Sequence, residues 1–207
     1  MNKKKLVGFF SHIPCIETER LLLRRLMQSD SHDMYEYAKK EQVTRYLLWE
    51  PHPDEDYTYR YLSAVQRQYR EGECYDWAIT LKASGKMIGT CGFAAFSPTD
   101  DRGEIGYVLN PDYWGHGIVP EAVMAVLEFG FRELNLNRIE AKYIFGNDRS
   151  RRVMEKCGMQ FEGVLHSYMK IKNRYCDIGI CSILRSHFEE LSQHVPFYYG
   201  RWKKTFF

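Results

Sequence analysis

Two glycines flank a histidine in the segment "YWGHGIVPEA", residues 113–122. The segment follows a predicted strand and precedes a predicted helix. The first turn of a helix presents about four unpaired N–H groups and roughly half an elementary positive charge. An anion reaches that backbone closely where side chains are absent, as at Gly115 and Gly117. The pattern therefore fits a phosphate site, although a plain turn has the same sequence and that alternative stays open.

Two common phosphate loops do not fit this segment. The dinucleotide fingerprint requires a third glycine where this chain has Pro120. The nucleotide triphosphate loop requires Gly-Lys-Ser or Gly-Lys-Thr, which the segment lacks. The remaining possibility is the pyrophosphate of an acyl-coenzyme A, and the wider sequence has to support it.

Two further positions carry groups suited to proton transfer. Glu104 begins a predicted strand, on which Gly106 and Val108 share its face. Asn147 and Ser150 form an N-x-x-S pattern at the start of a predicted helix. Each has an alternative explanation, since Glu104 is equally a solvated residue at a strand end and Asn147 a helix cap.

These residues have to be positioned by a mixed sheet with helices. Three strands joined by short links precede a strand–helix–strand crossover, which indicates a mostly antiparallel sheet covered by helices. A helix beginning at Ser29 or Asp30 is expected from its capping residue. Strands are predicted at 20–26, 75–82, 86–96, 103–110, 137–145 and as a pair over 159–184, and helices at 29–41, 57–70, 118–134, 148–157 and 186–194.

Several segments, in this order, resemble the GNAT superfamily of N-acetyltransferases, and most of all its RimJ/RimL-like, ribosomal-protein-alanine branch. They are "IETERLLLRRL", "GEIGYVLNPDYWGHGIVPEA", "NDRSRRVMEKCGMQFEGVL" and "YCDIGICSIL". Trp114 opens the loop, as is usual in this branch. The chain departs from the pattern at Val119, where Gly or Ala is typical, and at His166, where Arg is frequent.

The resemblance implies a single α/β (α+β) domain with a mixed, mostly antiparallel central sheet flanked by helices. The domain would span residues 16–190, with an N-terminal extension at 1–15 and an aromatic and basic C-terminal tail at 191–207. The implied reaction transfers acetyl from acetyl-CoA to a primary amine, and a protein N-terminal α-amine, as on a ribosomal protein, is one such acceptor.

The resemblance also assigns roles to residues. Glu104 would act as a base through water, and Ser150 would bind the leaving thiolate, with Tyr143 and Tyr168 as other possible acids. Arg149, Arg151 and Arg152 are candidates for the adenosine 3′-phosphate, or they form a solvated basic helix face. The implied cofactor-binding residues are Tyr107, Val108, Leu109, Trp114, Gly115, His116, Gly117, Ile118, Val119, Asn147 and Ser150.

The acceptor determines how hard the base must work. Freeing an α-amine of pKa about 8 at pH 7 costs roughly 1 kcal/mol, whereas freeing a lysine of pKa about 10.4 costs roughly 4.6 kcal/mol. A base that acts through water therefore suits an α-amine better than a lysine.

Composition indicates which partners are expected. A net charge of +2 gives no sign of DNA or membrane binding, and no apolar stretch approaches the roughly 20 residues of a membrane span. Six scattered cysteines fit a reducing cytoplasm, and no cluster suggests a metal. Monomer and homodimer both stay open. The alternatives to an enzyme are an inactive acyl-CoA-binding module and a ribosome- or RNA-associated protein acting through residues 197–207.

Overall fold

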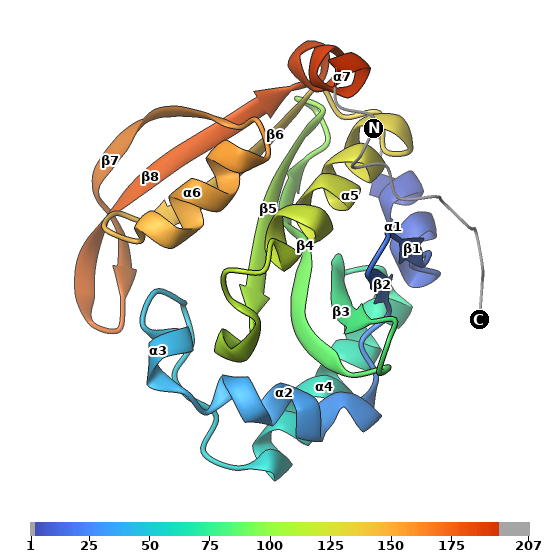
Figure 1. Ribbon diagram of the computed structural model, residues 1–207, viewed down its shortest axis with the longest axis vertical. Coiled ribbons are helices and arrows are strands. Elements are labelled where there is room, and N and C mark those ends of the chain that lie inside the picture. The colour runs from blue at the N-terminus through green and yellow to red at the C-terminus, as the bar shows by residue number, and fades with distance from the viewer. Residues whose placement is uncertain (1–2, 195–207) are drawn as a thin grey trace.

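A strongly twisted eight-stranded sheet runs through the part of the chain that the computed structural model describes, residues 3–194 (Figure 1). Its strand order is β1-β2-β3-β4-β5-β6-β8-β7. Only β5 and β6 run parallel, so the predicted mixed, mostly antiparallel sheet is confirmed. The strands are β1 (Ile16–Glu17), β2 (Leu21–Arg24), β3 (Asp76–Leu81), β4 (Met87–Ser97), β5 (Arg102–Leu109), β6 (Arg138–Ile144), β7 (Gln160–Ile171) and β8 (Arg174–Leu184).

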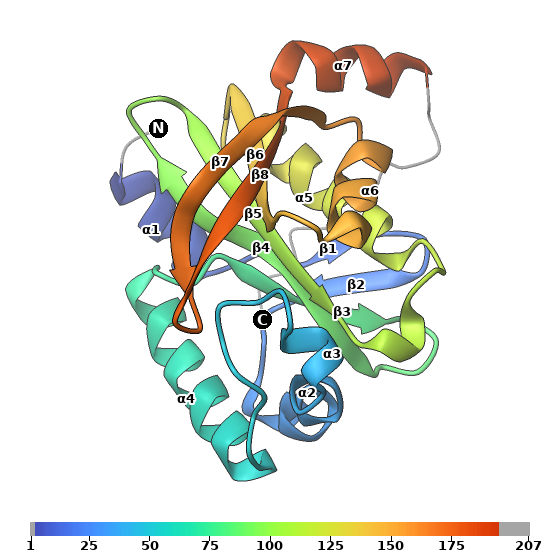
Figure 2. The same cartoon turned by 90° about the vertical axis from the view of Figure 1, so that its left-hand side faces the viewer.

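Helices cover the sheet on both faces (Figures 1 and 2). The group α2, α3 and α4 lies on one face, whereas α5 and α6 lie on the other. Helix α4 begins at Asp54, whose carboxylate accepts the Tyr57 N–H, and ends at Gly72 in the left-handed region. The helices are α1 (Lys3–Ser11), α2 (Ser31–Ala38), α3 (Glu41–Thr44), α4 (Glu55–Glu71), α5 (Ile118–Arg132), α6 (Asp148–Lys156) and α7 (Arg185–His194).

The helix predicted over 29–41 is wrong in its continuity. A 3-10 turn at Gln28–Asp30 precedes α2, and a break separates α2 from α3. Asp30 does not cap the helix with its side chain. Its carboxylate instead binds the Arg24 guanidinium at 2.7 and 2.8 Å and the Met27 N–H at 2.8 Å. Tertiary pairing with β2 therefore replaces the expected local cap.

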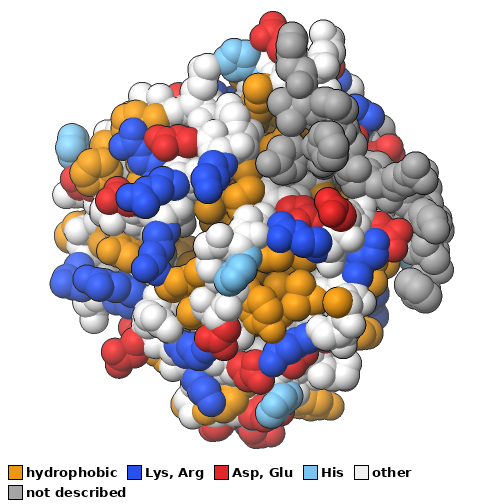
Figure 3. Space-filling model, in the orientation of Figure 1, with side chains coloured by type: hydrophobic (Ala, Val, Ile, Leu, Met, Phe, Trp, Pro, Cys, Tyr) orange, Lys and Arg blue, Asp and Glu red, His pale blue; other side chains and the backbone are white. Residues whose placement is uncertain are grey.

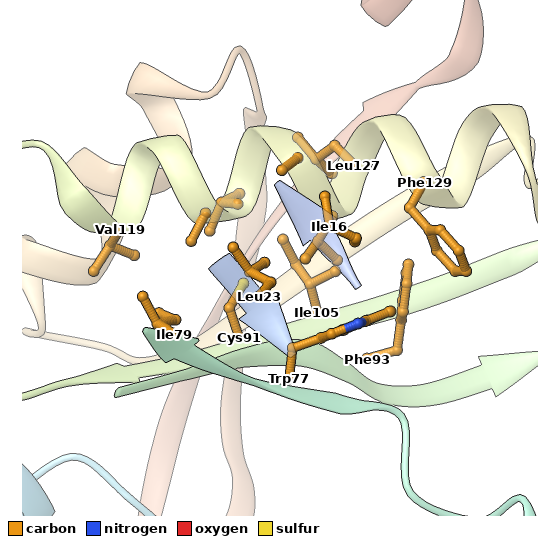
Figure 4. Close-up of a cluster of buried hydrophobic side chains, with 14 of the residues drawn as sticks. Ile16, Leu23, Trp77, Ile79, Cys91, Phe93, Ile105, Val119, Leu127 and Phe129 are labelled. Atoms are coloured by element: carbon orange, nitrogen blue, oxygen red, sulfur yellow. The ribbon is translucent and has the colours of Figure 1, made fainter. Parts of the chain in front are cut away.

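The main core lies between α5 and the sheet (Figure 4). Trp77 and Ile79 of β3, Cys91 of β4 and Ile105 of β5 all point toward this helix and are at most 2% exposed. Because side chains alternate along a strand, the neighbours of these residues must face α2 and α4 on the other side. This alternation decides which site residues share a face.

The N-terminal segment contributes to this core. Phe10 at the end of α1 is fully buried and packs edge-on against the rings of Tyr75, Trp77 and Phe129. The Trp77 indole also donates to the carbonyl of Pro14 at 2.7 Å. The boundary predicted at residue 15 stays a prediction, and the tail over 197–207 lies outside the described residues.

Candidate active site

The parallel strands β5 and β6 separate partway along their length. Their pairing covers Arg102–Ile105 against Arg138–Ala141. Beyond Ile105, β5 continues to Leu109 on β4, whereas β6 continues on β8. Beyond Ile105 and Ala141 the two strands therefore no longer pair with each other, and we call this break between the C-terminal half of β5 and the end of β6 the slot.

Backbone groups of β5 line this slot. Residues of an antiparallel strand alternate between bonding the neighbouring strand and facing away from it. The Asn110 N–H bonds the Ile88 carbonyl of β4 at 2.8 Å, so Gly106 and Val108 also face β4. Tyr107 and Leu109 then direct their N–H and C=O groups toward β6. The Leu109 carbonyl accepts the Trp114 indole N–H at 3.0 Å, which ties the following loop to the strand.

The loop that follows β5 leads directly into α5. Gly115 and Gly117 have φ of +85° and +73°, a region that favours glycine. A Cβ at Gly115 would meet no described atom within 4 Å. Gly117 is the N-cap of α5 and has no side chain to satisfy the first-turn N–H groups. Val119 is buried toward Ile79 (Figure 4), so its departure from Gly or Ala does not narrow the loop.

Hydrogen bonds among Thr18, Arg20 and Glu121, which we call the brace, hold the glycine loop between β5 and α5. The Glu121 carboxylate of α5 accepts the Thr18 hydroxyl at 2.5 Å, the Arg20 N–H at 2.9 Å and the Arg20 Nε at 2.6 Å. Arg20 Nη1 then donates to the His116 carbonyl at 2.8 Å. His116 itself is exposed, and its backbone rather than its ring is held. The brace joins the turn between β1 and β2 to a loop about 100 residues later, so local sequence patterns cannot reveal it.

Basic side chains lie on the neighbouring helix. Lys and Arg side chains gather over the part of the molecule formed by α6, β7 and β8 (Figure 3). Arg149 lies 4.5 Å above the Trp114 ring and so stands beside the loop. Arg151 instead pairs with Glu155 at 2.8 Å and covers the Phe161 ring. Of the three predicted arginines, Arg149 has a described contact with the loop.

Ser150 lies at the start of α6, close to β5. Asn147 caps this helix by accepting the Ser150 N–H at 3.3 Å, and its Nδ2 donates to Ser150 Oγ at 3.1 Å. The Ser150 hydroxyl hydrogen is therefore left for another acceptor. The Tyr107 hydroxyl donates to the Ser150 carbonyl at 3.0 Å, and burial raises the pKa of this phenol, which stays a neutral donor. The capping explanation of Asn147 is confirmed.

Glu104 is not a solvated residue at a strand end. Its carboxylate accepts Lys142 Nζ of β6 at 2.6 Å, and the two side chains are 23% and 22% exposed. Burial, the largest single influence, acts to lower the pKa of Lys142, but the Glu104 and Glu140 carboxylates together raise it. Glu104 lies within the last residues that pair β5 with β6, and Lys142 is the first residue of β6 beyond them. Gly106, next on the same face, leaves open space, since a Cβ there would meet no described atom within 4 Å.

The two phenols named as other acids lie on different sides of the sheet. The Tyr143 ring is buried against Gly179, and its hydroxyl has no partner among the described residues. Burial raises its pKa. Tyr168 is 53% exposed and its ring lies 6.0 Å from Lys142 Nζ, beside the ion pair of Glu104. His166, in place of the frequent Arg, contacts Asp177 at 3.0 Å.

The candidate acid and base lie on opposite faces of the sheet. Tyr107 shares the α5 and α6 face with Ile105, and it contacts Ser150 there. Glu104, Gly106 and Val108 occupy the face of α2 and α4. The slot between β5 and β6 is where a group bound in the sheet would meet both. This separation could not be seen from sequence spacing alone.

Several structural features lie outside this site. An open hollow of about 590 Å³ on the outer face of α4 is lined by three arginines and does not border the loop or the slot. The described residues hold no group of three or more His, Cys, Asp or Glu placed to bind a metal. Within the same part of the chain, every helix is too short or too polar to cross a membrane.

The fold and the loop together define an acetyltransferase, and the chain belongs to the GNAT family. The model of the acetyltransferase (GNAT) domain matches residues 20–160. Among similar proteins is the N-acetyltransferase p20 of Bacillus licheniformis, itself uncharacterized, which is 34% identical over 83% of this chain and 96% of its own. The ribosomal protein uS5-alanine N-acetyltransferase of Escherichia coli is 24% identical over 83% of this chain and 92% of its own.

A solved structure gives the same result. The GNAT-family acetyltransferase of Bacillus anthracis superposes with a TM-score of 0.74 at 30% identity, covering 83% of this chain and 99% of that one. The resemblance to the GNAT superfamily is thus confirmed, together with the class of enzyme.

Proposed function

We propose that this enzyme transfers the acetyl group of acetyl-CoA to a primary amine, with a protein N-terminal α-amine as acceptor. The observation that carries the proposal is the slot between β5 and β6, which ends at a glycine loop on the N-terminus of α5. A pyrophosphate is favoured at such a helix end. The Tyr107 backbone groups suit a pantetheine arm, which would pair as an added strand.

Residues on the two faces of the sheet would carry out different steps of the reaction. On one face Glu104, through a water molecule, accepts a proton from the bound ammonium. The free amine attacks the thioester carbon, a C–N bond forms and the C–S bond breaks. On the other face the Ser150 hydroxyl donates a hydrogen bond to the leaving thiolate, which takes a second proton from the nitrogen and leaves one on the amide. Lys142 has to yield its place on Glu104 when the acceptor ammonium arrives.

An α-amine is the acceptor that this arrangement favours. Its deprotonation at pH 7 costs roughly 1 kcal/mol against roughly 4.6 kcal/mol for lysine. The Escherichia coli relative, by its name, acts on the alanine of a ribosomal protein, which supports a protein N-terminus here.

The acceptor is tested with paired peptides. A peptide beginning with alanine and lacking lysine is compared with its N-terminally blocked twin that carries one lysine, and thiol release from acetyl-CoA is followed. We expect release with the first peptide only. Preference for the blocked peptide would contradict the α-amine assignment. Binding of acetyl-CoA with no release for any amine would favour the inactive binding module.

The brace supplies a prediction about cofactor affinity. Replacing Arg20 by Ala removes a charge-assisted hydrogen bond to the His116 carbonyl, an interaction of about 1.5–3 kcal/mol. We expect KM for acetyl-CoA to rise about tenfold or more, with kcat little changed. S-acetylpantetheine, which lacks the pyrophosphate, is the control donor. Its kcat/KM should be equal in wild type and variant, and an equal loss with both donors would contradict a role in holding the loop.

Ser150 and Asn147 give opposite expectations for activity and stability. Ser150→Ala removes the donor to the thiolate, so turnover should fall by about 10–100-fold. The free energy of unfolding should change by less than about 0.5 kcal/mol. Asn147→Ala removes the cap and should cost roughly 1 kcal/mol of stability. Both are read by denaturant unfolding and by thiol release. Full activity of Ser150→Ala would direct attention to Tyr143 and Tyr168.

A further inference from the structure

A second carboxyl group lies on the same face of the sheet as Glu104. Asp76 of β3 pairs with Gly92 of β4, and Gly92 pairs with Gly106 of β5. Residues directly opposite each other in antiparallel strands point to the same face. The three positions therefore form a row that ends at the slot.

The Asp76 side chain lies beside the second position of this row. A Cβ on Gly92 would lie 2.3 Å from the Tyr75 carbonyl oxygen, 2.5 Å from Asp76 Cα and 2.7 Å from Asp76 Oδ1, so β3 approaches this glycine closely and the carboxyl group lies beside it. The next position, Gly106, is open above its backbone for at least 4 Å among the described atoms. Gly106 is also the first residue of β5 beyond its pairing with β6. The two positions between the Asp76 carboxyl group and the start of the slot are therefore glycines, which carry no side chain.

The surroundings of Asp76 contain hydroxyl and thiol groups. Thr90 of β4 hydrogen bonds the carboxylate, as does the N–H of Trp77. Burial outweighs these bonds and raises the pKa of Asp76 to about 7. Within residues 3–194, Asp76 is in no ion pair with Lys, Arg or His, unlike Glu104. The titratable groups that interact with it are Tyr37 of α2, Tyr61 and Tyr69 of α4, Cys74, and Cys91 of β4.

We propose that Asp76 is a further general base, which accepts a proton from the acceptor ammonium above Gly106. This inference rests on the proposed function. The ammonium gives one proton to the Asp76 carboxylate through water, the resulting amine bonds the acetyl carbon, and the C–S bond breaks. The second amine proton goes to the thiolate, so the products are the amide, the free thiol and a protonated Asp76 that returns its proton to solvent.

The two carboxyl groups are suited to different parts of this task. Glu104 is held by Lys142 beside the slot, so besides accepting a proton through water it orients the arriving ammonium. Asp76 has no such cation and changes its protonation near neutral pH, where a base can both take up and release a proton. Turnover should therefore increase as pH rises through about 7, since protonated Asp76 cannot accept a proton.

The test is the pH profile of kcat in Asp76→Asn, measured with acetyl-CoA and the alanine-initiated peptide. We expect turnover at pH 7 to fall at least tenfold, and the rise of kcat with pH near 7 to disappear. The loss should shrink at high pH, where the amine deprotonates unaided. The thermal shift with acetyl-CoA should persist. Asp56→Asn on the exposed start of α4 is the matched control, and its profile should equal that of the wild type.

A second variant keeps the test decisive if Asp76→Asn folds poorly. Thr90→Val removes a hydrogen bond that lowers the pKa of Asp76. The rise of kcat should then move to higher pH while the maximum rate is retained. The ionisation of the acceptor itself cannot produce this shift, because the acceptor is unchanged. A rise near pH 7 that persists in Asp76→Asn, or that stays in place in Thr90→Val, would overturn the role of Asp76 alone. Absence of transfer by the wild-type chain would overturn the proposed function as well.

Discussion

Gly117→Glu should abolish the binding of acetyl-CoA. The substitution places a carboxylate at the N-cap of α5, where the pyrophosphate is expected, and the like charges repel. For the wild type, acetyl-CoA at 100 times its Kd should stabilise the fold by roughly 2.7 kcal/mol, or about 5–10 °C in Tm. We expect this shift to vanish in the variant when both are measured by thermal denaturation.

Gly85→Glu is the matched control for this variant. Gly85 lies in the turn between β3 and β4, has the same φ of +73° and has no described atom within 4 Å of a Cβ. Both substitutions should therefore carry a similar backbone penalty of about 1–2 kcal/mol. Only Gly117→Glu should lose the response to acetyl-CoA. A retained shift in that variant, or an equal loss in the control, would place the phosphates elsewhere.

Glu104→Gln should lower turnover by about 10²–10⁴, the usual contribution of an acid or base. Glutamine keeps the size of the side chain, so the thermal shift with acetyl-CoA should be unchanged. The loss should shrink at high pH, because more of the amine is then free. Thiol release measured over a range of pH checks each of these expectations.

Glu71→Gln, at the exposed C-terminal end of α4, serves as the control for a simple loss of charge. It should retain the wild-type rate at every pH. Lys142 occupies the Glu104 carboxylate in this structure, so a Glu104→Gln enzyme with the wild-type rate would mean that the ion pair is structural. Proton transfer would then depend on Asp76.

The sequence predicts those parts of the molecule whose signals are local. The glycine loop, helix α5 and the hairpins of β3, β4 and β5 follow from short patterns. The interrupted helix over 29–41 does not, because Asp30 binds Arg24 of β2 instead of its own helix. Helix α1 also lacked a clear pattern.

Some residues of the candidate site were likewise predictable from local motifs, and others were not. Gly117 and Ser150 belong to recognisable motifs, whereas Arg20 and Glu121 meet only in three dimensions. Asp76 required the register of three strands, and nothing near it in the sequence indicates that it shares a row with Gly106.

The slot also has a consequence for the order of events. Because Ser150 and Glu104 lie on opposite faces of the sheet, the proposed function has each substrate reach the slot from its own side. The acceptor can dock from the side of α2 and α4 while the donor stays bound on the side of α5 and α6. If the proposed function holds, we therefore expect direct transfer within a ternary complex, without an acetylated form of the protein.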